Sequence, residues 1–316
     1  MRTGDIMNRK PPLVTVGLAV YNGALYLKSA LDSLLAQSFT NFELVISDNA
    51  STDDTPLICR EYVSRDSRVR YVCNATNLGA AQNFNRVFAL ARGEYFMWAA
   101  HDDAYHSEYL TSCLAILENF PEVVLCFTQE VGIDEQGKSL GMRPYRLDTT
   151  LRYAEDRFIA LLRLDRGSPP IFGLIRTDVL RKTSLIGSYD GSDQVLLAEL
   201  ALQGAFHQIP QDLLLHREHG ERSVYQHRDR HSATIWFDTA KERKIIFPQW
   251  RWFYGYCRAI GRAPLTMQQK GTCALHMLRW MRMRRNGRKM IDDVKVAFWV
   301  ISGRVLGMNK RVKNVA

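Results

Sequence analysis

Residues 93–103 read Gly93-Glu94-Tyr95-Phe96-Met97-Trp98-Ala99-Ala100-His101-Asp102-Asp103, an apolar run that ends in two adjacent carboxylates. A short, aromatic-rich run introduced by a glycine is typical of a strand buried on both faces, although a buried helical turn has a similar composition. In open α/β sheets, ligands bind beyond the carboxyl ends of the strands, so Asp102 and Asp103 would emerge at a ligand site. The alternative is that both acids begin the helix that follows Tyr105, because Asp is common near helix N-termini.

Apolar segments and helical periodicity alternate on both sides of this stretch. Such alternation at short spacing predicts βαβ crossovers and a parallel sheet. Residues 131–150 are expected to form a hairpin or an excursion loop. The expected strands are residues 13–20, 42–47, 69–73, 123–128 and 171–175, with short extended segments at 206–210 and 213–216. The expected helices are residues 27–35, 55–63, 80–91, 108–119, 154–164, 177–182 and 194–202, followed by a helical region beyond residue 230.

Polar clusters follow three of the expected strands, at residues 19–23, 48–54 and 101–103. Parallel strands would bring all three clusters to one edge of the sheet. The first strand is followed by neither a G-x-G-x-x-G fingerprint nor a P-loop, which disfavours a nicotinamide-dependent oxidoreductase. A nucleotide would instead be held by carboxylates on its base and ribose, with a divalent metal ion on its diphosphate.

Five motifs at these strands and loops carry a resemblance to a known family. They are Val14-Thr15-Val16, Ala19-Val20-Tyr21-Asn22, Ser47-Asp48-Asn49-Ala50-Ser51-Thr52-Asp53, Asn77-Leu78-Gly79 and Gly93-Glu94-Tyr95. As a set, they resemble the family 2 glycosyltransferases of GT-A fold, over roughly residues 12–225. The resemblance implies an α/β fold with a Rossmann-like, mostly parallel central sheet flanked by helices. It also implies a nucleotide-sugar donor, a Mn²⁺ or Mg²⁺ ion, and transfer to an acceptor hydroxyl with inversion at the anomeric carbon.

The resemblance also assigns residues to a donor site. Asp48 matches the position that contacts the nucleotide base in similar enzymes. Asp102 matches the carboxylate near the ribose or the metal, and Asp103 matches the direct metal ligand. The family often has Asp-x-Asp at this motif, whereas this chain has His101-Asp102-Asp103, so the division of roles between the two acids stays open. The other donor-pocket residues that the resemblance implies are Val20, Tyr21, Asn22, Asn77 and Gly79.

Residues 216–223 resemble the Arg-x-His…Ser segment that similar enzymes fold back toward the diphosphate. The resemblance implies that Arg217 donates hydrogen bonds to phosphate oxygens, and that His219 orients the phosphate or completes the metal shell. Glu218 departs from the commoner basic run of the family. The alternative for this segment is an exposed polar turn.

A catalytic base is also required, because a sugar hydroxyl is a poor nucleophile until its proton is removed. In similar enzymes the base is usually the Asp of a Glu-Asp pair that opens a helix in the second half of the domain. That position matches Asp193, which directly precedes an apolar helical segment, and Asp190 is the second candidate. The alternative for Asp193 is a helix N-cap without a chemical role.

Positive charge is concentrated in the C-terminal part of the sequence. Residues 1–240 carry 24 Lys/Arg and 30 Asp/Glu, a net charge of −6, whereas residues 241–316 carry 18 and 3, a net charge of +15. Such a segment favours either a polyanionic partner or a solvated helical surface. Within residues 278–289, basic side chains alternate with Trp and Met, which indicates a helix that lies on an anionic membrane. Nucleic-acid binding is not expected, because no recognition module accompanies the charge.

These observations predict two regions. Residues 1–230 form a GT-A glycosyltransferase domain, with a donor half at about 12–128 and an acceptor half at about 129–230, and residues 231–316 form a helical, basic extension. No secretory signal or membrane-spanning segment is expected. The six cysteines lack metal-site spacing, which favours buried free thiols in a reducing cytoplasm. The protein is therefore expected in the cytoplasm, either dissolved there or peripheral at the inner face of the membrane.

The predicted function is metal-dependent, inverting sugar transfer in polysaccharide or glycan assembly. The expected donor is a uridine or thymidine diphosphate sugar, and the expected acceptor is a glycan or a lipid-linked sugar. The alternative is a non-catalytic nucleotide-sugar-binding or scaffold protein that retains the fold. An enzyme should lose turnover on Asp193→Asn and keep metal-dependent nucleotide binding, which separates the two hypotheses.

Overall fold

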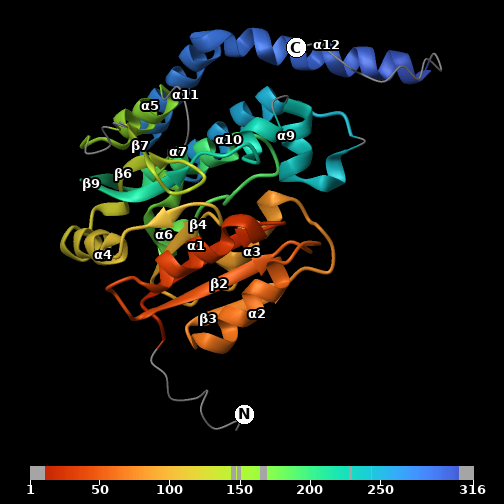
Figure 1. The fold of residues 1–316 in the computed structure, drawn as a ribbon. Helices are drawn as coiled ribbons and strands as arrows, with labels where there is room; N and C mark the ends of the chain where they lie inside the picture. The colour runs from red at the N-terminus through yellow and green to blue at the C-terminus, as the bar shows by residue number, and fades with distance from the viewer. Residues whose placement is uncertain are drawn as a thin grey trace.

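The computed structural model describes residues 11–143, 147, 151–163, 169–227, 230–242 and 244–305. Its described residues form a mixed sheet with helices on both faces and a helical layer at the C-terminal end of the chain (Figure 1). Parts of the expected 131–150 loop, the last residue of the expected 154–164 helix and residues 306–316 of the basic segment lie outside the described residues.

The first half of the chain builds the parallel part of the sheet. Its strands are β1 (Val14–Val20), β2 (Phe42–Asp48), β3 (Val69–Cys73) and β4 (Tyr95–Ala99). They lie in the order β3-β2-β1-β4, and each neighbouring pair is parallel. Every residue of β1, β2 and β4 is buried, because helices cover both faces of these strands. The strand predicted from residues 93–103 is therefore confirmed, and its two carboxylates follow its carboxyl end.

The second half of the chain adds the mixed part of the sheet. β8 (Leu174–Arg176) pairs antiparallel with both β4 and β6 (Val123–Ile133), and β9 (Ala205–Arg217) runs parallel to β6. β5 (Ala104–Tyr105) pairs with β9, and β7 (Ser139–Arg143) forms a hairpin with β6. The expected α/β architecture with a mostly parallel centre is confirmed, and so is the hairpin within residues 131–150.

Two details of the strand prediction are wrong. Residues 169–172 form a 3₁₀ turn closed by a hydrogen bond from Gly173 N to Pro170 O, so the strand expected at 171–175 begins only at Leu174. The two extended segments expected at 206–210 and 213–216 belong to one strand, β9. Its pairing with β6 shifts register between Ile209 and Asp212, which accommodates Pro210, a residue that has no N–H to donate.

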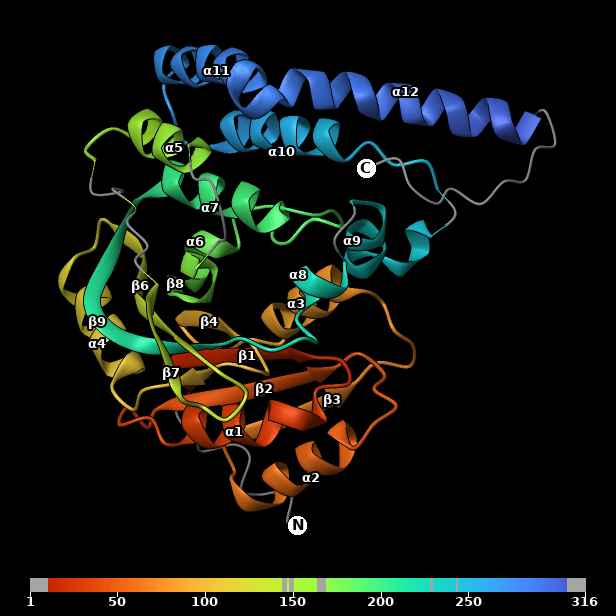
Figure 2. The same cartoon turned by 45° about the horizontal axis from the view of Figure 1, so that its top comes forward.

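Helices cover the two faces of the sheet in separate layers (Figure 2). On one face Met97 of β4 packs with α1 (Ala24–Leu35), α2 (Thr55–Arg65) and α4 (Tyr109–Asn119). On the other face Phe96 and Trp98 belong to a core with α3 (Ala80–Ala89), α5 (Ala154–Leu162) and α7 (Ser192–Gln203). Consecutive β4 side chains thus enter opposite cores, as the pleat of a strand requires.

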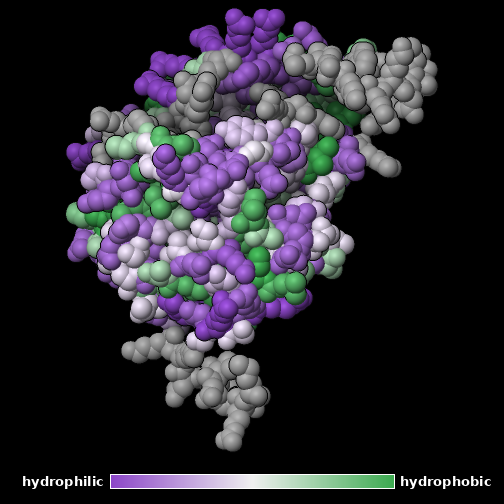
Figure 3. Space-filling model, in the orientation of Figure 1, coloured by the Kyte–Doolittle hydropathy of each residue, from purple (hydrophilic) through white to green (hydrophobic). Residues whose placement is uncertain are grey.

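The C-terminal helices belong to the second of these cores. Trp280 is only 2% exposed and packs edge-on against Tyr256, with the ring centroids 5.8 Å apart. The remaining elements are α6 (Thr177–Leu180), α8 (Ser223–Gln226), α9 (Arg230–Phe237), η2 (Thr239–Lys241), α10 (Pro248–Arg262), α11 (Met267–Arg282), η3 (Met283–Arg285) and α12 (Asn286–Val305). Figure 3 shows hydrophilic residues over the top of the molecule, where α11 meets α12.

The helix expected at residues 278–289 is not continuous. A 3₁₀ turn at Met283–Arg285 separates α11 from α12, and Arg285 has a positive φ of 59°. Trp280 faces the protein core, so it is not a membrane-facing side chain of this segment. Among the described residues, no helix is long and apolar enough to cross a bilayer.

Trp280→Ala should lower the free energy of unfolding by about 3–5 kcal/mol, because it removes a large buried aromatic side chain. The matched control is Leu278→Ala, two positions away and 53% exposed, which should change stability by no more than about 0.5 kcal/mol. Chemical denaturation followed by circular dichroism measures both. If Trp280→Ala shifts only a separate, minor transition, the C-terminal helices do not share the core of the sheet.

Candidate donor and metal site

The loops that follow β1 and β2 are tied to each other by side chains. Asn22, with a positive φ of 49°, donates its N–H to Ser51 Oγ at 2.8 Å, and its Oδ1 accepts from Thr52 N at 2.8 Å. Asp53 Oδ2 accepts from Ala24 N, the first residue of α1, at 3.0 Å. The polar cluster at residues 48–54 therefore holds the loop after β1 in place. The predicted clusters at residues 19–23 and 48–54 thus meet at one edge of the sheet.

Asp48 is enclosed at the end of β2. Its Oδ1 accepts from Ser51 N at 2.9 Å, and its Oδ2 accepts from the Tyr71 hydroxyl at 2.7 Å. Burial and the neighbouring Asp48 carboxylate raise the pKa of Tyr71, so this phenol stays protonated and donates. Asp48 is fully buried, and the contact with a nucleotide base that the sequence predicts stays a prediction.

An amide network lies beside Asp48. Asn49 Oδ1 accepts from Asn74 Nδ2 at 2.8 Å and from Leu78 N at 3.0 Å, while Asn49 Nδ2 donates to Asn77 Oδ1 at 2.8 Å. Asn77 Oδ1 also accepts from Gly79 N at 2.9 Å. The sequence reasoning named Asn77 and Gly79 but missed Asn49 and Asn74. The available signal was that each of these two asparagines directly follows a strand, at the same edge as the other clusters.

Asp103 is the more enclosed of the two carboxylates after β4. It is 2% exposed, and its Oδ1 accepts from the backbone N–H of Arg217 at 2.9 Å. Its Oδ2 lies 3.2 Å from Nδ1 of His216. Burial lowers the pKa of His216, but the hydrogen bond and the negative charge of Asp103 outweigh burial and raise it. Asp103 therefore joins the end of β4 to the end of β9.

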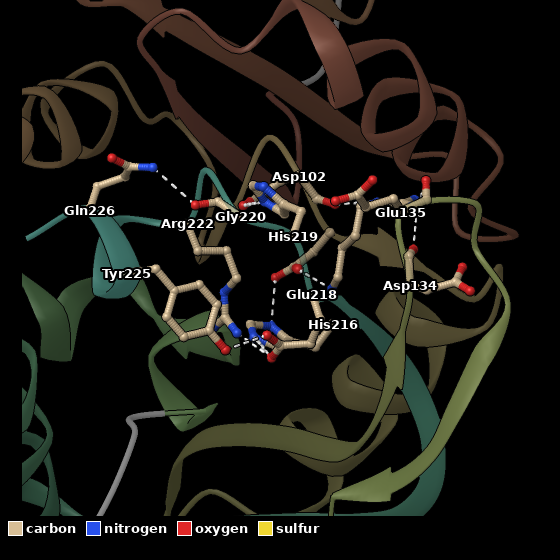
Figure 4. A network of polar contacts seen from close by, with 12 residues as sticks. Asp102, Asp134, Glu135, His216, Glu218, His219, Gly220, Arg222, Tyr225 and Gln226 are labelled. Atoms are coloured by element: carbon tan, nitrogen blue, oxygen red, sulfur yellow. Dashed lines mark hydrogen bonds and ion pairs between the residues drawn. The ribbon is translucent and has the colours of Figure 1, made fainter.

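Asp102 is the more accessible carboxylate, with 19% of its side chain exposed. Its Oδ2 lies 2.9 Å from Nε2 of His219 (Figure 4). Burial alone would raise the pKa of Asp102, but the hydrogen bond from His219 and the electrostatic influence of the nearby His101 and His219 side chains hold it well below its usual range. Asp102 is therefore ionised at neutral pH.

His219 is a buried imidazole that packs against Tyr26, with 4.7 Å between the ring centroids. Its Nδ1 atom has no hydrogen-bond partner among the described residues. The Asp102 carboxylate and the His219 imidazole, whose Oδ2 and Nε2 atoms lie 2.9 Å apart, are ligand types that a divalent ion accepts. Substrate oxygens and water would be its further ligands. The donor set of Asp102 and His219 thus fits the metal ion that the sequence predicts.

Arg217 directs its guanidinium into the protein. Nε donates to Asp102 O at 2.9 Å, and Nη1 donates to Asp134 O at 3.0 Å and to Glu135 O at 3.1 Å. The guanidinium also lies over the Tyr26 ring, 5.0 Å from its centroid. The Arg217 side chain therefore ties the turn of the β6–β7 hairpin to the backbone of Asp102, and the predicted phosphate contact stays a prediction.

Glu218 forms contacts within its own segment, which accounts for an acidic residue at this position. Its carboxylate pairs with Arg222 and accepts from the Tyr225 hydroxyl at 2.8 Å (Figure 4). Gln226 Nε2 donates to Gly220 O at 3.0 Å. Residues 218–226 are thereby folded into a closed turn that holds His219 against Asp102, so the segment is more than an exposed polar turn.

Asp193 lies in the first turn of α7, and its Oδ1 accepts from Gln194 N at 2.9 Å. The N-cap of α7 is Gly191, which has a positive φ of 75°, so the N-cap alternative for Asp193 is wrong. Asp190 belongs to the preceding loop, and its carbonyl accepts from the Trp252 indole of α10. A side chain at Gly191 would overlap the Trp252 ring, so α10 packs directly on the residues that lead into α7.

A short segment connects this loop with the donor-side loop. Lys241 Nζ donates to Ser188 O at 2.8 Å and lies 3.2 Å from Asp238 Oδ2. Thr239 Oγ1 donates to Asn77 O at 3.1 Å. Gly79 has a φ of +85° and approaches the backbone of residues 237–238 so closely that a Cβ would lie 2.6 Å from a carbonyl oxygen. Residues 237–241 therefore lie between the two loops that carry the predicted donor and base residues.

Curated relatives match less than half of this chain. An uncharacterized glycosyltransferase of Rickettsia typhi is 32% identical over 153 residues, which are 48% of this chain and 45% of that protein. An uncharacterized protein of Mycobacterium tuberculosis is 38% identical over 121 residues, which are 37% of this chain and 35% of that protein. The chain thus spans less than half of the length of these curated relatives.

Solved structures share the fold over nearly the whole chain. A structure of residues 1–349 of Staphylococcus aureus TarS has a TM-score of 0.56 at 17% identity, covering 96% of this chain and 94% of that fragment. A mannosyltransferase of Pyrobaculum calidifontis, solved with GDP-Man and Mn²⁺, has a TM-score of 0.52 at 17% identity, covering 92% of this chain and 87% of that chain. The family described as Glycosyl transferase family 2 matches residues 15–183, more than half of the sequence. The chain therefore belongs to glycosyltransferase family 2, with a GT-A type fold.

Proposed function

We propose that this glycosyltransferase is metal-dependent and inverting, and that it transfers a sugar from a nucleoside diphosphate sugar to an acceptor hydroxyl in polysaccharide or glycan assembly. The observation that carries the proposal is the pair of Asp102 and His219, 2.9 Å apart beyond the carboxyl end of β4. The loops after β1 and β2 end at the same edge of the sheet. A diphosphate held at that edge would meet the pair directly.

Of the two carboxylates after β4, we assign the metal to Asp102, with His219 as a second ligand. Asp103 has both oxygens engaged by β9 residues, so metal ligation would break contacts that hold the site together. Within the described part of the chain, no group of three or more His, Cys, Asp or Glu residues is placed to hold an ion. Mn²⁺ or Mg²⁺ would therefore take its remaining ligands from the diphosphate and water. The ion would neutralise the charge that develops on the departing nucleoside diphosphate.

The donor pocket is assigned to the loops after β1, β2 and β3. Tyr21 is exposed beside Asn22 and offers a ring for the base, while Asn77 and Gly79 form the opposite loop. Asp48 would act on the base indirectly, by holding the Ser51 backbone. We propose a uridine or thymidine diphosphate sugar. TarS has been solved with UDP and with UDP-GlcNAc, which supports a uridine nucleotide, whereas the Pyrobaculum mannosyltransferase carries GDP-Man.

Asp193 is proposed as the catalytic base. The acceptor oxygen would form a bond to the anomeric carbon while the bond from that carbon to the diphosphate oxygen breaks on the opposite face, and the hydroxyl proton would pass to the Asp193 carboxylate. The N-terminal turn of α7 favours an ionised carboxylate at this position. Asp190 is the second candidate, because it lies in the adjoining loop that Trp252 and Lys241 hold.

The acceptor and the location of the enzyme belong to the same proposal. A glycan or a lipid-linked sugar would supply the hydroxyl, and a lipid-linked acceptor would bring the enzyme to the cytoplasmic face of a membrane. The basic C-terminal residues support a peripheral position there, since they attract anionic headgroups. The segment at 278–289 contributes exposed arginines such as Arg279 and Arg282, but its tryptophan is part of the core.

Asp102→Asn and His219→Ala should each abolish the Mn²⁺-dependent part of the thermal shift that a nucleoside diphosphate produces, because each removes a metal ligand. The assay screens nucleoside diphosphates and their sugars with and without Mn²⁺, and a shift that needs both fixes the donor class. Asp178→Asn is the matched control, since this carboxylate is exposed on α6. An unchanged metal-dependent shift in Asp102→Asn would overturn the ligand assignment.

Asp193→Asn should lower turnover by about 10²–10⁴-fold, because the acceptor proton loses its base. Metal-dependent nucleotide binding should persist, as measured by the same thermal shift. Asp190→Asn tests the second candidate in parallel, and the larger loss of turnover identifies the base. A wild-type protein that binds a nucleotide sugar but shows neither transfer nor hydrolysis across a donor panel with Mn²⁺ would favour the scaffold alternative.

A further inference from the structure

Helices α11 and α12 form the outermost layer on one side of the protein (Figures 1 and 2). α12 packs against α10 through residues that share one face of the helix. Trp250 Nε1 donates to Met290 O at 2.9 Å, and Gln249 N donates to Asp293 Oδ2 at 2.7 Å. Ala297 is buried on the same side, four residues beyond Asp293. The rest of α12 runs along and past the body of the protein.

A second face of α12 carries exposed apolar side chains. Ile291 is 57% exposed, Val294 48% and Phe298 72%. Their spacing of three and four residues places them in one stripe along the helix. On α11, Leu275 and Leu278 are exposed as well. They are three residues apart, and the exposed Arg282 follows four residues after Leu278, so the three side chains share one face of α11. Apolar side chains that repeat on an outward helix face indicate a surface that another body covers.

Basic side chains lie beside this stripe, where Lys295 Nζ is 3.6 Å from the exposed Asp292 carboxylate. Residues 267–305 carry nine Lys/Arg and two Asp/Glu, a net charge of +7. The exposed basic residues of the layer are Arg279, Arg282, Arg285, Arg288 and Lys295. Figure 3 shows hydrophilic residues over the junction of α11 and α12. Arg288 and Lys295 follow one another at a spacing of seven residues, so they flank the apolar stripe along the same side of α12.

We propose that the outward face of α12, with the end of α11, binds the surface of an anionic membrane. Ile291, Val294 and Phe298 enter the boundary between headgroups and acyl chains, and the arginines and lysines contact the anionic headgroups. A phosphate-bearing nucleic acid would satisfy the charge but leave the apolar stripe exposed to water. A second copy of the chain would cover the stripe but would bring two segments together that each carry a net charge of +7 over residues 267–305. Only an anionic lipid surface satisfies both features.

This proposal stands independently of the donor site, because none of its residues belongs to that site. It keeps the arginines of the expected segment 278–289 but moves the apolar contact with the membrane from Trp280, which is buried, to Ile291 and Phe298, which are exposed. A membrane held by α12 would place the enzyme beside lipid-linked acceptors, which agrees with the proposed function without depending on it.

Flotation of the full chain with vesicles tests the proposal. Vesicles of phosphatidylcholine alone are compared with vesicles that also contain phosphatidylglycerol, at about 0.1 M salt. The wild type should float with the anionic vesicles only. The double variant Ile291→Ser with Phe298→Ser should reduce the bound fraction by about tenfold or more, because two apolar side chains no longer enter the lipid. The charge variant Arg288→Glu with Lys295→Glu should reduce it as well.

The matched control is Leu57→Ser, which removes an equally exposed apolar residue from α2 and should float like the wild type. Thermal unfolding of each variant checks that the fold is retained. Absence of wild-type flotation on anionic vesicles overturns the proposal. Flotation that is unchanged in the Ile291→Ser, Phe298→Ser variant also overturns it. A wild-type dimer in analytical ultracentrifugation that dissociates in this variant overturns it as well, because a second copy of the chain would then cover the face. Binding to a DNA or RNA duplex that survives the double variant, without lipid binding, assigns the basic face to nucleic acid instead.

Discussion

The buried carboxylate of Asp103 is the contact on which the candidate site depends. It accepts a hydrogen bond from the backbone N–H of Arg217 and lies within hydrogen-bonding distance of His216 Nδ1. These contacts connect the end of β9 to the loop that follows β4. A buried carboxylate without such partners is costly, because its charge would be desolvated without compensation. Once the two strands are joined in this way, His219 lies against Asp102, and the Arg217 side chain reaches the carbonyls of the β6–β7 turn. The approach of Asp102 to His219 therefore depends on one buried junction.

The parallel strands supply the second constraint. Because β1, β2 and β4 run in the same direction, the loops after them open at one edge of the sheet. Short polar side chains then bind the loops to each other, as Asn22 does with Ser51 and Asn49 with Asn77. The loops are thus held in a fixed arrangement by the protein itself, which reduces the ordering that a bound nucleotide would require.

The C-terminal helices support the site as well as extending the fold. α10 places Trp252 against Gly191 at the start of α7, and Lys241 holds the carbonyl of Ser188. The same short segment contacts Asn77 on the donor side. Since α10 and α11 share a core with the sheet, the region that the sequence marked as an extension contributes to the position of the candidate base. The outward face of α12 remains available for a different task.

The sequence by itself determined most strands and helices and the edge at which the polar clusters gather, because apolar periodicity and turn residues act within a few positions of the chain. It also carried the family, through motifs at the starts of β1 and β4 and in the loops that follow β1, β2 and β3. Only the tertiary structure decided which of Asp102 and Asp103 is enclosed, where Arg217 directs its donors, and that Trp280 faces the core. Asp103 and Arg217 are 114 positions apart, and burial of a side chain depends on helices that arrive from distant parts of the chain. Local sequence carries no signal for either, so these roles follow from packing alone.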